Sequence, residues 1–132
     1  MTMLKALLLP FDEDRAVEVI DFDDSSYQNL YPIVAPESRM FTAQDFPGGT
    51  MYGDDEGLLW GDPSKRINAR AMQLLGERSG HGIEDFMSPL VGDWLVFGPV
   101  DAEGNNTSVP QDVIDFRFTW TARRPSVTGE AS

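Results

Sequence analysis

The sequence predicts a single α+β domain, in which a mixed, mainly antiparallel sheet carries about two packed helices. Its 132 residues suffice for one hydrophobic core, and neither a linker nor an internal repeat divides them. Short apolar and β-branched runs bounded by Pro, Gly and Asp recur along the chain, as is typical of strands. One longer segment, residues 65–75, has its apolar residues at helical spacing. We expect the domain to cover residues 1–122.

The first strands follow from the N-terminal pattern. Residues 3–9 form an apolar run closed by Pro10, which predicts a buried strand. An acidic turn at residues 12–14 separates it from the β-branched run 16–20. We expect this second run to be a strand that pairs antiparallel with the first.

A short helix and a third strand come next. Asp23 or Asp24 is a suitable helix cap, and the helix would run through Leu30 and end before Pro36. Residues 39–43 then predict the third strand.

The middle of the chain predicts a hairpin followed by the best helix. Residues 50–52 and 58–60 flank the acidic, glycine-ended turn 54–57, which favours pairing of the two runs. Ser64 is a suitable cap for the helix, and Gly76 a suitable end.

The last third of the chain is less uniform. Residues 90–98 predict a long central strand. Apolar and polar residues alternate over 114–120, which favours a half-buried strand, and a helical turn with Pro110 at its first position is the alternative for the preceding residues. Residues 123–132 have little to bury, and we expect a disordered C-terminal tail.

The net charge of −12 restricts the partners. Direct nucleic-acid binding and attachment to an anionic membrane are disfavoured, because both require Lys and Arg. The charge either keeps the protein soluble or presents acid to a basic partner, as a mimic of the DNA backbone would. Cysteine is absent, which fits a reducing cytoplasm, and no apolar run approaches the roughly 20 residues of a membrane span.

Candidate chemistry is sparse. His81 lies between glycines in a loop, whereas a catalytic base needs a rigid, oriented setting. The acidic run 54–56 is better interpreted as a solvated turn than as a Mg²⁺ site, since neighbouring acids in a turn point different ways. We therefore expect no enzymatic activity, cofactor or metal.

Basic residues open the predicted helix beside this acidic turn. Lys65, Arg66 and Arg70 are expected to pair with the acids of residues 54–56 or with Asp62. Exposed tyrosine and tryptophan side chains mark protein interfaces. The candidate interaction face consists of Tyr52, Asp54, Asp55, Glu56, Trp60 and Arg66.

Several segments together carry a family pattern. They are residues 3–9, the run Met-Tyr-Gly-Asp-Asp-Glu-Gly-Leu-Leu at 51–59, the Asp62-Pro63 turn, the helix through 68–71, and Leu90-Val91-Gly92-Asp93 leading to Val96-Phe97-Gly98. Over roughly residues 3–115 the chain resembles the domain of unknown function 3846 family, small proteins of bacteriophages, other mobile elements and actinobacteria. It departs from that family at Ser64-Lys65, where an Asn often follows the Pro, and in its long segment 36–49.

The resemblance implies an origin more than an activity. The family has no established catalytic residues, so none is assigned to this chain. It implies a phage-type accessory protein in the cytoplasm of a bacterial host, and the leading hypothesis is that it binds and modulates a host protein. The alternatives are a DNA-mimic inhibitor that occupies a basic DNA-binding cleft, and an enzyme with metal-assisted or carboxylate chemistry.

Overall fold

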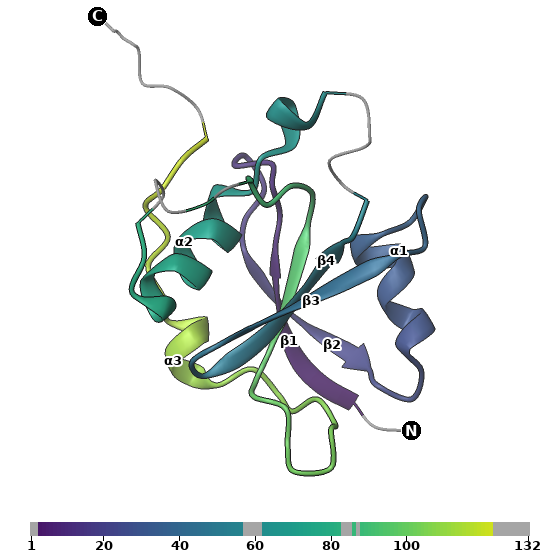
Figure 1. Cartoon of the computed structure of the whole chain (residues 1–132). Helices are drawn as coiled ribbons and strands as arrows, with labels where there is room; N and C mark the ends of the chain where they lie inside the picture. The colour runs from purple at the N-terminus through teal and green to yellow at the C-terminus, as the bar shows by residue number, and fades with distance from the viewer. Residues whose placement is uncertain (1–2, 57–61, 83–85, 87, 123–132) are drawn as a thin grey trace, which may run out of the picture.

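Five antiparallel strands form the centre of the molecule (Figure 1). The computed structural model describes residues 3–56, 62–82, 86 and 88–122. The strands are β1 (Met3–Leu9), β2 (Glu18–Asp23), β3 (Phe41–Phe46), β4 (Gly49–Asp54) and β5 (Trp94–Phe97), in the spatial order β2-β1-β5-β4-β3. The predicted α+β class is confirmed, and every pairing between these strands is antiparallel.

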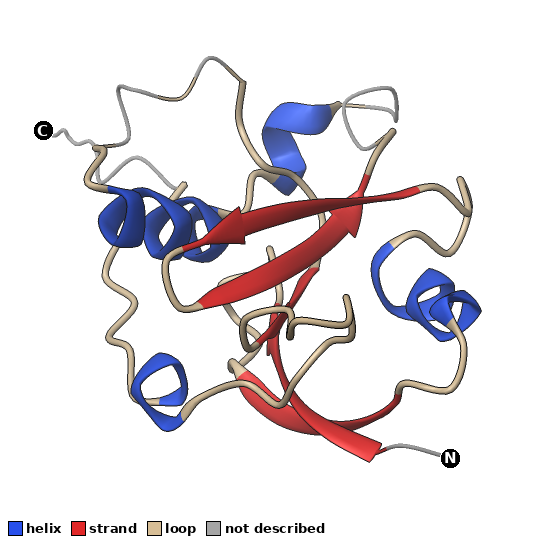
Figure 2. Ribbon diagram, turned by 60° about the horizontal axis from the view of Figure 1, so that its bottom comes forward, coloured by secondary structure: helices blue, strands red, loops and turns tan. Residues whose placement is uncertain are grey.

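Short helices cover both faces of the sheet. They are η1 (Tyr27–Leu30), α1 (Tyr31–Val34), η3 (Pro63–Arg66), α2 (Ala69–Ser79) and α3 (Gln111–Ile114). Figures 1 and 2 show α2 and α3 on one side of the sheet and α1 on the other. Within the described ranges, no helix combines the length and the apolar character that a membrane span requires.

Two hydrophobic cores result from the alternation of side chains along each strand. Leu7 and Leu9 of β1 pack with Leu74 of α2 in one core, and Leu8 packs with Val34 of α1 in the other. All four residues of β5 are buried, because this strand lies in the middle of the sheet with a covered face on each side. The predicted central strand is therefore confirmed, although it is shorter than 90–98.

The hairpin on β4 differs from the prediction. β4 pairs with β3 on one side and with β5 on the other, so its partner across the tight turn is β3. That turn is Pro47-Gly48, in which proline fixes the first central residue and Gly48 takes a φ of 99°. The predicted second arm, residues 58–60, lies outside the described residues.

The start of α2 also differs from the prediction. Ser64 was predicted to cap this helix, but the first capping residue is Asp62. Asp62 caps only the short η3, by accepting from the Ser64 amide at 3.1 Å. Ile67 is extended and bridges Val91, which interrupts the helix. Asn68 then caps α2, and Arg66 and Arg70 consequently do not share one helix.

Two other helix boundaries were predicted wrongly. α2 continues through Gly76 and ends at Ser79, and the following Gly80 is its C-cap, with a φ of 79° that suits glycine. The cap of η1 is Ser26, whose hydroxyl accepts from the amide of the second residue of the helix, and not Asp23 or Asp24. Asp23 instead closes a turn by accepting from the Ser25 amide.

The strand predicted over 114–120 is not formed, since Ile114 ends α3 and residues 115–120 have no regular secondary structure. Residues 114–120 nevertheless alternate between half-buried and exposed, as the sequence pattern predicted. Gln73 of α2 provides hydrogen bonds that a neighbouring strand would otherwise provide. Its side-chain oxygen accepts from the amides of Thr119 and Trp120, both at 2.8 Å. The preceding helical turn is α3, with Pro110 as its cap and not its first residue.

Candidate functional site

The predicted interaction face begins on β4, where Tyr52 and Asp54 point to the same side of the sheet. Two-residue spacing places both on the α1 side. Tyr52 is half-buried, with its ring centroid 5.7 Å from those of Phe41 and Phe97. Asp54 ends the strand and accepts a 2.7 Å hydrogen bond from the Ser38 hydroxyl.

The acidic turn after β4 is held by its own backbone. The Glu56 amide donates to the Asp54 carboxylate at 2.9 Å, and the Asp55 amide donates to the Met40 carbonyl at 2.9 Å. Trp60, the aromatic member of the predicted face, lies outside the described residues. Asp54 therefore organises this turn, whereas the Asp55 side chain is exposed.

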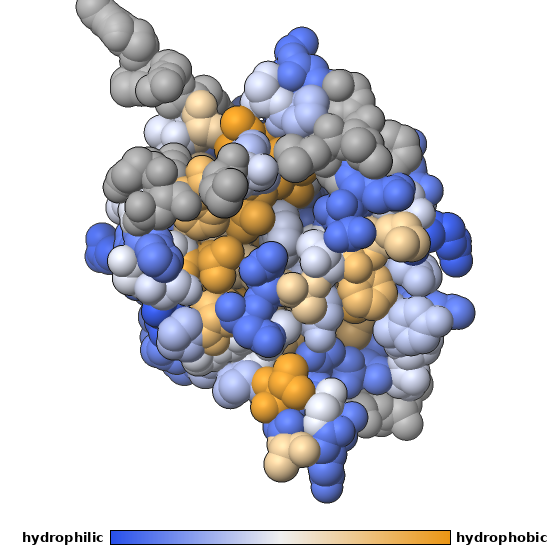
Figure 3. All heavy atoms as spheres, viewed as in Figure 1, coloured by the Kyte–Doolittle hydropathy of each residue, from blue (hydrophilic) through white to orange (hydrophobic). Residues whose placement is uncertain are grey.

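A shallow pocket of about 330 Å³ adjoins Asp54 and Asp55. Its other walls come from Phe86 and residues 88–91, from two residues of β3, and from the apolar side chains Leu75 and Trp94. Figure 3 shows apolar side chains, in orange, gathered in a band on the left of the view, between α2 and the strands. The two acids thus lie at the edge of an apolar depression.

Arg66 lies on the other side of Asp54. Both line a pocket of about 230 Å³, together with Glu37 and Asp93. The structure therefore brings Asp54 and Arg66 to one depression, while Tyr52 lines a different one.

The predicted pairing of Arg70 with the acidic turn is wrong. Its guanidinium donates to the carbonyl of Pro10 at 3.1 Å and reaches those of Asp12 and Glu13 at 3.5 and 3.4 Å. The expected interaction of basic residues with Asp62 agrees better with the structure, because the charges of Lys65 and Arg66 act on this carboxylate. The hydrogen bonds from Ser64 lower the pKa of Asp62, and the charges of Lys65 and Arg66 lower it further.

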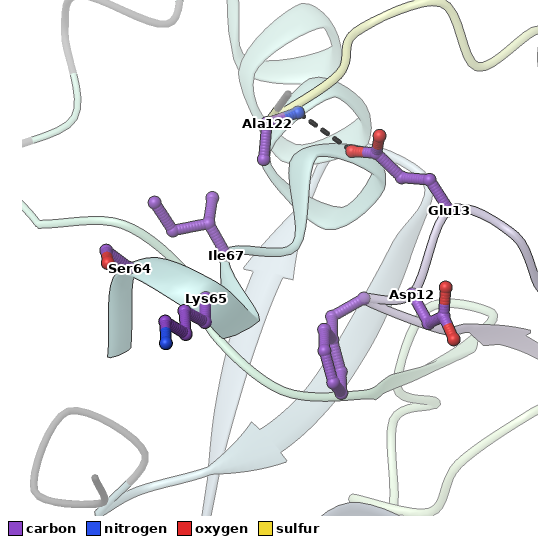
Figure 4. A pocket seen from close by; sticks show the side chains of 7 residues that line it. Asp12, Glu13, Ser64, Lys65, Ile67 and Ala122 are labelled. Atoms are coloured by element: carbon purple, nitrogen blue, oxygen red, sulfur yellow. Dashed lines mark hydrogen bonds between the residues drawn. The ribbon is translucent and has the colours of Figure 1, made fainter. Parts of the chain in front are cut away.

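A third pocket, of about 320 Å³, opens between the β1–β2 loop and η3 (Figure 4). Figure 4 shows Glu13 directed at Ala122, whose amide donates to its carboxylate at 2.8 Å. Lys65 lies on the opposite wall from Glu13. Glu13 thus attaches residues 121–122 to the loop after β1.

Tyr52 lines the most distinctive depression, which we call the Tyr52 pocket. It measures about 210 Å³ and lies between η1, the sheet and the loop before α3. Its lining residues are Phe22, Asp24, Tyr27, Leu30, Phe41, Tyr52, Gly104, Asn105 and Asn106.

A hydrogen-bond chain crosses this pocket. The Tyr52 hydroxyl donates to the Asn106 side-chain oxygen at 2.8 Å, and the Asn106 amide group donates to the Asp24 carboxylate at 3.3 Å. Burial raises the pKa of Tyr52, the hydrogen bond to Asn106 opposes the rise, and the negative charges of Asp24 and Asp45 add to it. The pocket therefore combines aromatic walls with a negative potential.

An aromatic row leads from the pocket to the surface. We define it as Tyr27, Tyr31, Phe41 and Tyr52, whose successive ring centroids lie 5.7–6.2 Å apart. Tyr27 is 62% exposed. Except for Tyr52, the sequence interpretation missed these residues. The four-residue spacing of Tyr27 and Tyr31, which places them on one side of a helical segment, was an available signal.

Two further observations, on metal-binding groups and on similar proteins, assign no additional role to the site. The described residues contain no group of three or more His, Cys, Asp or Glu side chains that could hold a metal ion. Comparison of the chain with protein-family models, curated proteins and solved structures gives no match. The resemblance to the family of unknown function therefore stays a prediction.

Proposed function

We propose that this chain is a small acidic accessory protein of phage type that binds and modulates a host protein in the bacterial cytoplasm and is not an enzyme. The aromatic row, with its exposed end at Tyr27, carries this proposal. Tyrosine side chains contribute large, rigid contact areas and dominate protein-binding hot spots. The exposed ring of Tyr27 packs on the ring of Phe41, which is partly buried. An exposed ring held in place by a packed neighbour is suited to anchor a partner protein.

The distribution of acids favours this function over DNA mimicry. Exposed carboxylates come from the β1–β2 loop, β2, β3, α2 and α3, for example Asp14, Glu18, Asp45, Glu77 and Asp112. β2 and β3 are the two opposite edges of the sheet, and α2 and α3 lie on one of its faces, so these acids are spread over both edges and one face. A mimic of the DNA backbone needs an ordered stripe of charge on one face, whereas dispersed charge promotes solubility.

Affinity capture from bacterial lysate tests the proposal. The tagged chain is compared with Tyr27→Ala and with Val19→Ala, a control that truncates another exposed apolar residue, on β2. We expect one host protein to bind the wild type and the control at about 0.1 M and about 1 M salt, and to be lost with Tyr27→Ala.

Two outcomes would contradict the proposal. Capture that disappears at high salt and ignores Tyr27→Ala would favour the DNA-mimic alternative, since exposed charge pairs are screened. Recovery of no specific host protein at either salt concentration would reject host binding.

A further inference from the structure

The walls of the Tyr52 pocket are suited to a cation. The rings of Phe22, Tyr27, Phe41 and Tyr52 all border it. A ring face attracts ammonium and guanidinium groups through its quadrupole. The pocket volume of about 210 Å³ is below the range of about 300–1,000 Å³ typical of sites for drug-sized ligands, so its size fits a single side chain.

The carboxylate at the pocket supplies the matching charge. Asp24 is half-buried, and among the described residues its hydrogen-bond partner is the Asn106 amide group at 3.3 Å. The salt bridges of the described chain do not include Asp24. Its charge therefore has no cationic counterpart there, in a chain whose net charge is −12.

The aromatic row already holds one cation. The guanidinium carbon of Arg39 lies 5.0 Å from the centroid of the Tyr31 ring. Arg39 has a φ of 57°, a conformation unusual for a residue with a side chain. A guanidinium thus already lies over the ring next to Phe41, which lines the pocket.

We propose that the Tyr52 pocket accepts a cationic side chain, arginine or lysine, from the partner protein. The cation would lie against the rings of Phe41 and Tyr52, with its charge directed at Asp24. This inference rests on the proposed function and adds to it the chemistry of the partner, which is a protein segment that presents a basic residue.

An NMR titration of the full ¹⁵N-labelled chain tests the inference without any host protein. The probes are blocked amides of arginine, of lysine, and of citrulline, which is the neutral counterpart of arginine. We expect arginine and lysine to shift the amide resonances of Asp24, Tyr52 and Asn106 saturably. Citrulline should bind about tenfold more weakly, because it lacks the charge-assisted contact.

Matched variants identify the site. Asp24→Asn should weaken arginine binding about tenfold, whereas Glu18→Gln, the same loss of one charge at the start of β2, should leave it unchanged. Equal binding of citrulline and arginine to the wild type would overturn the inference, as would the absence of a saturable shift. The wild-type comparison decides the matter even if Asp24→Asn does not fold.

The two proposals fail separately. Saturable arginine binding combined with failed lysate capture would keep the pocket assignment and reject the host partner. Lysate capture that is sensitive to Tyr27→Ala, combined with no arginine binding, would reject only the cation pocket.

Discussion

Asn68→Asp is expected to destabilise the protein strongly at neutral pH, although aspartate caps helices as well as asparagine does. The reason is the burial of Asn68, which is 0% exposed. Its side-chain oxygen accepts from the Ala71 amide at 2.9 Å and so caps α2. Its side-chain nitrogen donates to the carbonyls of Leu9 and Gly92, both at 2.8 Å. One amide thus joins β1, α2 and the turn before β5.

The magnitude follows from these contacts. An aspartate at this position keeps the cap but removes both donors, which leaves the carbonyls of Leu9 and Gly92 beside a buried negative charge. Each buried carbonyl that loses its partner costs about 1–3 kcal/mol, so the free energy of unfolding should fall by about 4 kcal/mol. Asn68→Ala removes the cap as well but introduces no charge, and should cost a similar amount.

The pH dependence separates charge from lost hydrogen bonds. Burial and the two carbonyls would raise the pKa of the new carboxyl group above its ordinary value of about 3.9. A group with a raised pKa in the folded state costs stability at high pH, and this cost disappears as the pH falls below its unfolded pKa. Asn68→Asp should therefore gain stability relative to Asn68→Ala on acidification.

Urea unfolding monitored by circular dichroism, at about pH 7 and about pH 4, measures both effects. The difference between the two variants is taken at each pH, so that the titration of the other acids cancels. An aspartate variant within about 0.5 kcal/mol of the wild type at neutral pH would refute the reasoning, because that is the range of ordinary surface substitutions.

Other contacts give further tests. Gly53→Ala should destabilise the fold by about 1–3 kcal/mol in urea unfolding, because the new Cβ would lie 2.2 Å from a ring atom of Trp94. Gln73→Ala should cost about 2 kcal/mol and expose residues 117–120 to proteases, since it removes the acceptor of two amides at 2.8 Å. Tyr52 should ionise above its ordinary pKa of about 10, so its contribution to stability is present below that pH and is lost as the pH rises further; a spectrophotometric titration against Tyr52→Phe measures this.

Local patterns were sufficient to predict the central strands. The apolar run 3–9 coincides with β1, and the run that contains β5 was correctly placed at the centre of the sheet. Both strands are covered by cores on two faces, so burial alone makes their sequences apolar. Such a signal needs no knowledge of the partner strand.

Pairing and capping could not be predicted in this way. Pro47-Gly48 and the acidic turn after β4 both carry hairpin signals, and the choice between them depends on β5, which occupies the second edge of β4 from a distant part of the chain. Similarly, Ser64 and Asn68 are both good caps. The contacts that distinguish Asn68 are with Leu9 and Gly92, which no local pattern reveals.

The candidate site was predicted least completely, for the same reason. The predicted face was a nearly continuous stretch of sequence, from Tyr52 to Arg66. The Tyr52 pocket instead combines residues of β2, η1, β3 and β4 with the loop at 104–106. Of the predicted residues that the structure describes, Tyr52 alone belongs to it.

The open edges of the sheet have a consequence for association between molecules. In the sheet that the structure describes, β2 and β3 are the edge strands, and an edge strand is where another strand can add through its backbone groups. Glu18, Asp21 and Asp23 occupy β2, and Asp45 lies exposed on β3. Two copies that met edge to edge would bring these carboxylates together. We therefore expect the acidity of the edge strands to oppose growth of the sheet into a fibril, and this effect should weaken as salt screens the charges.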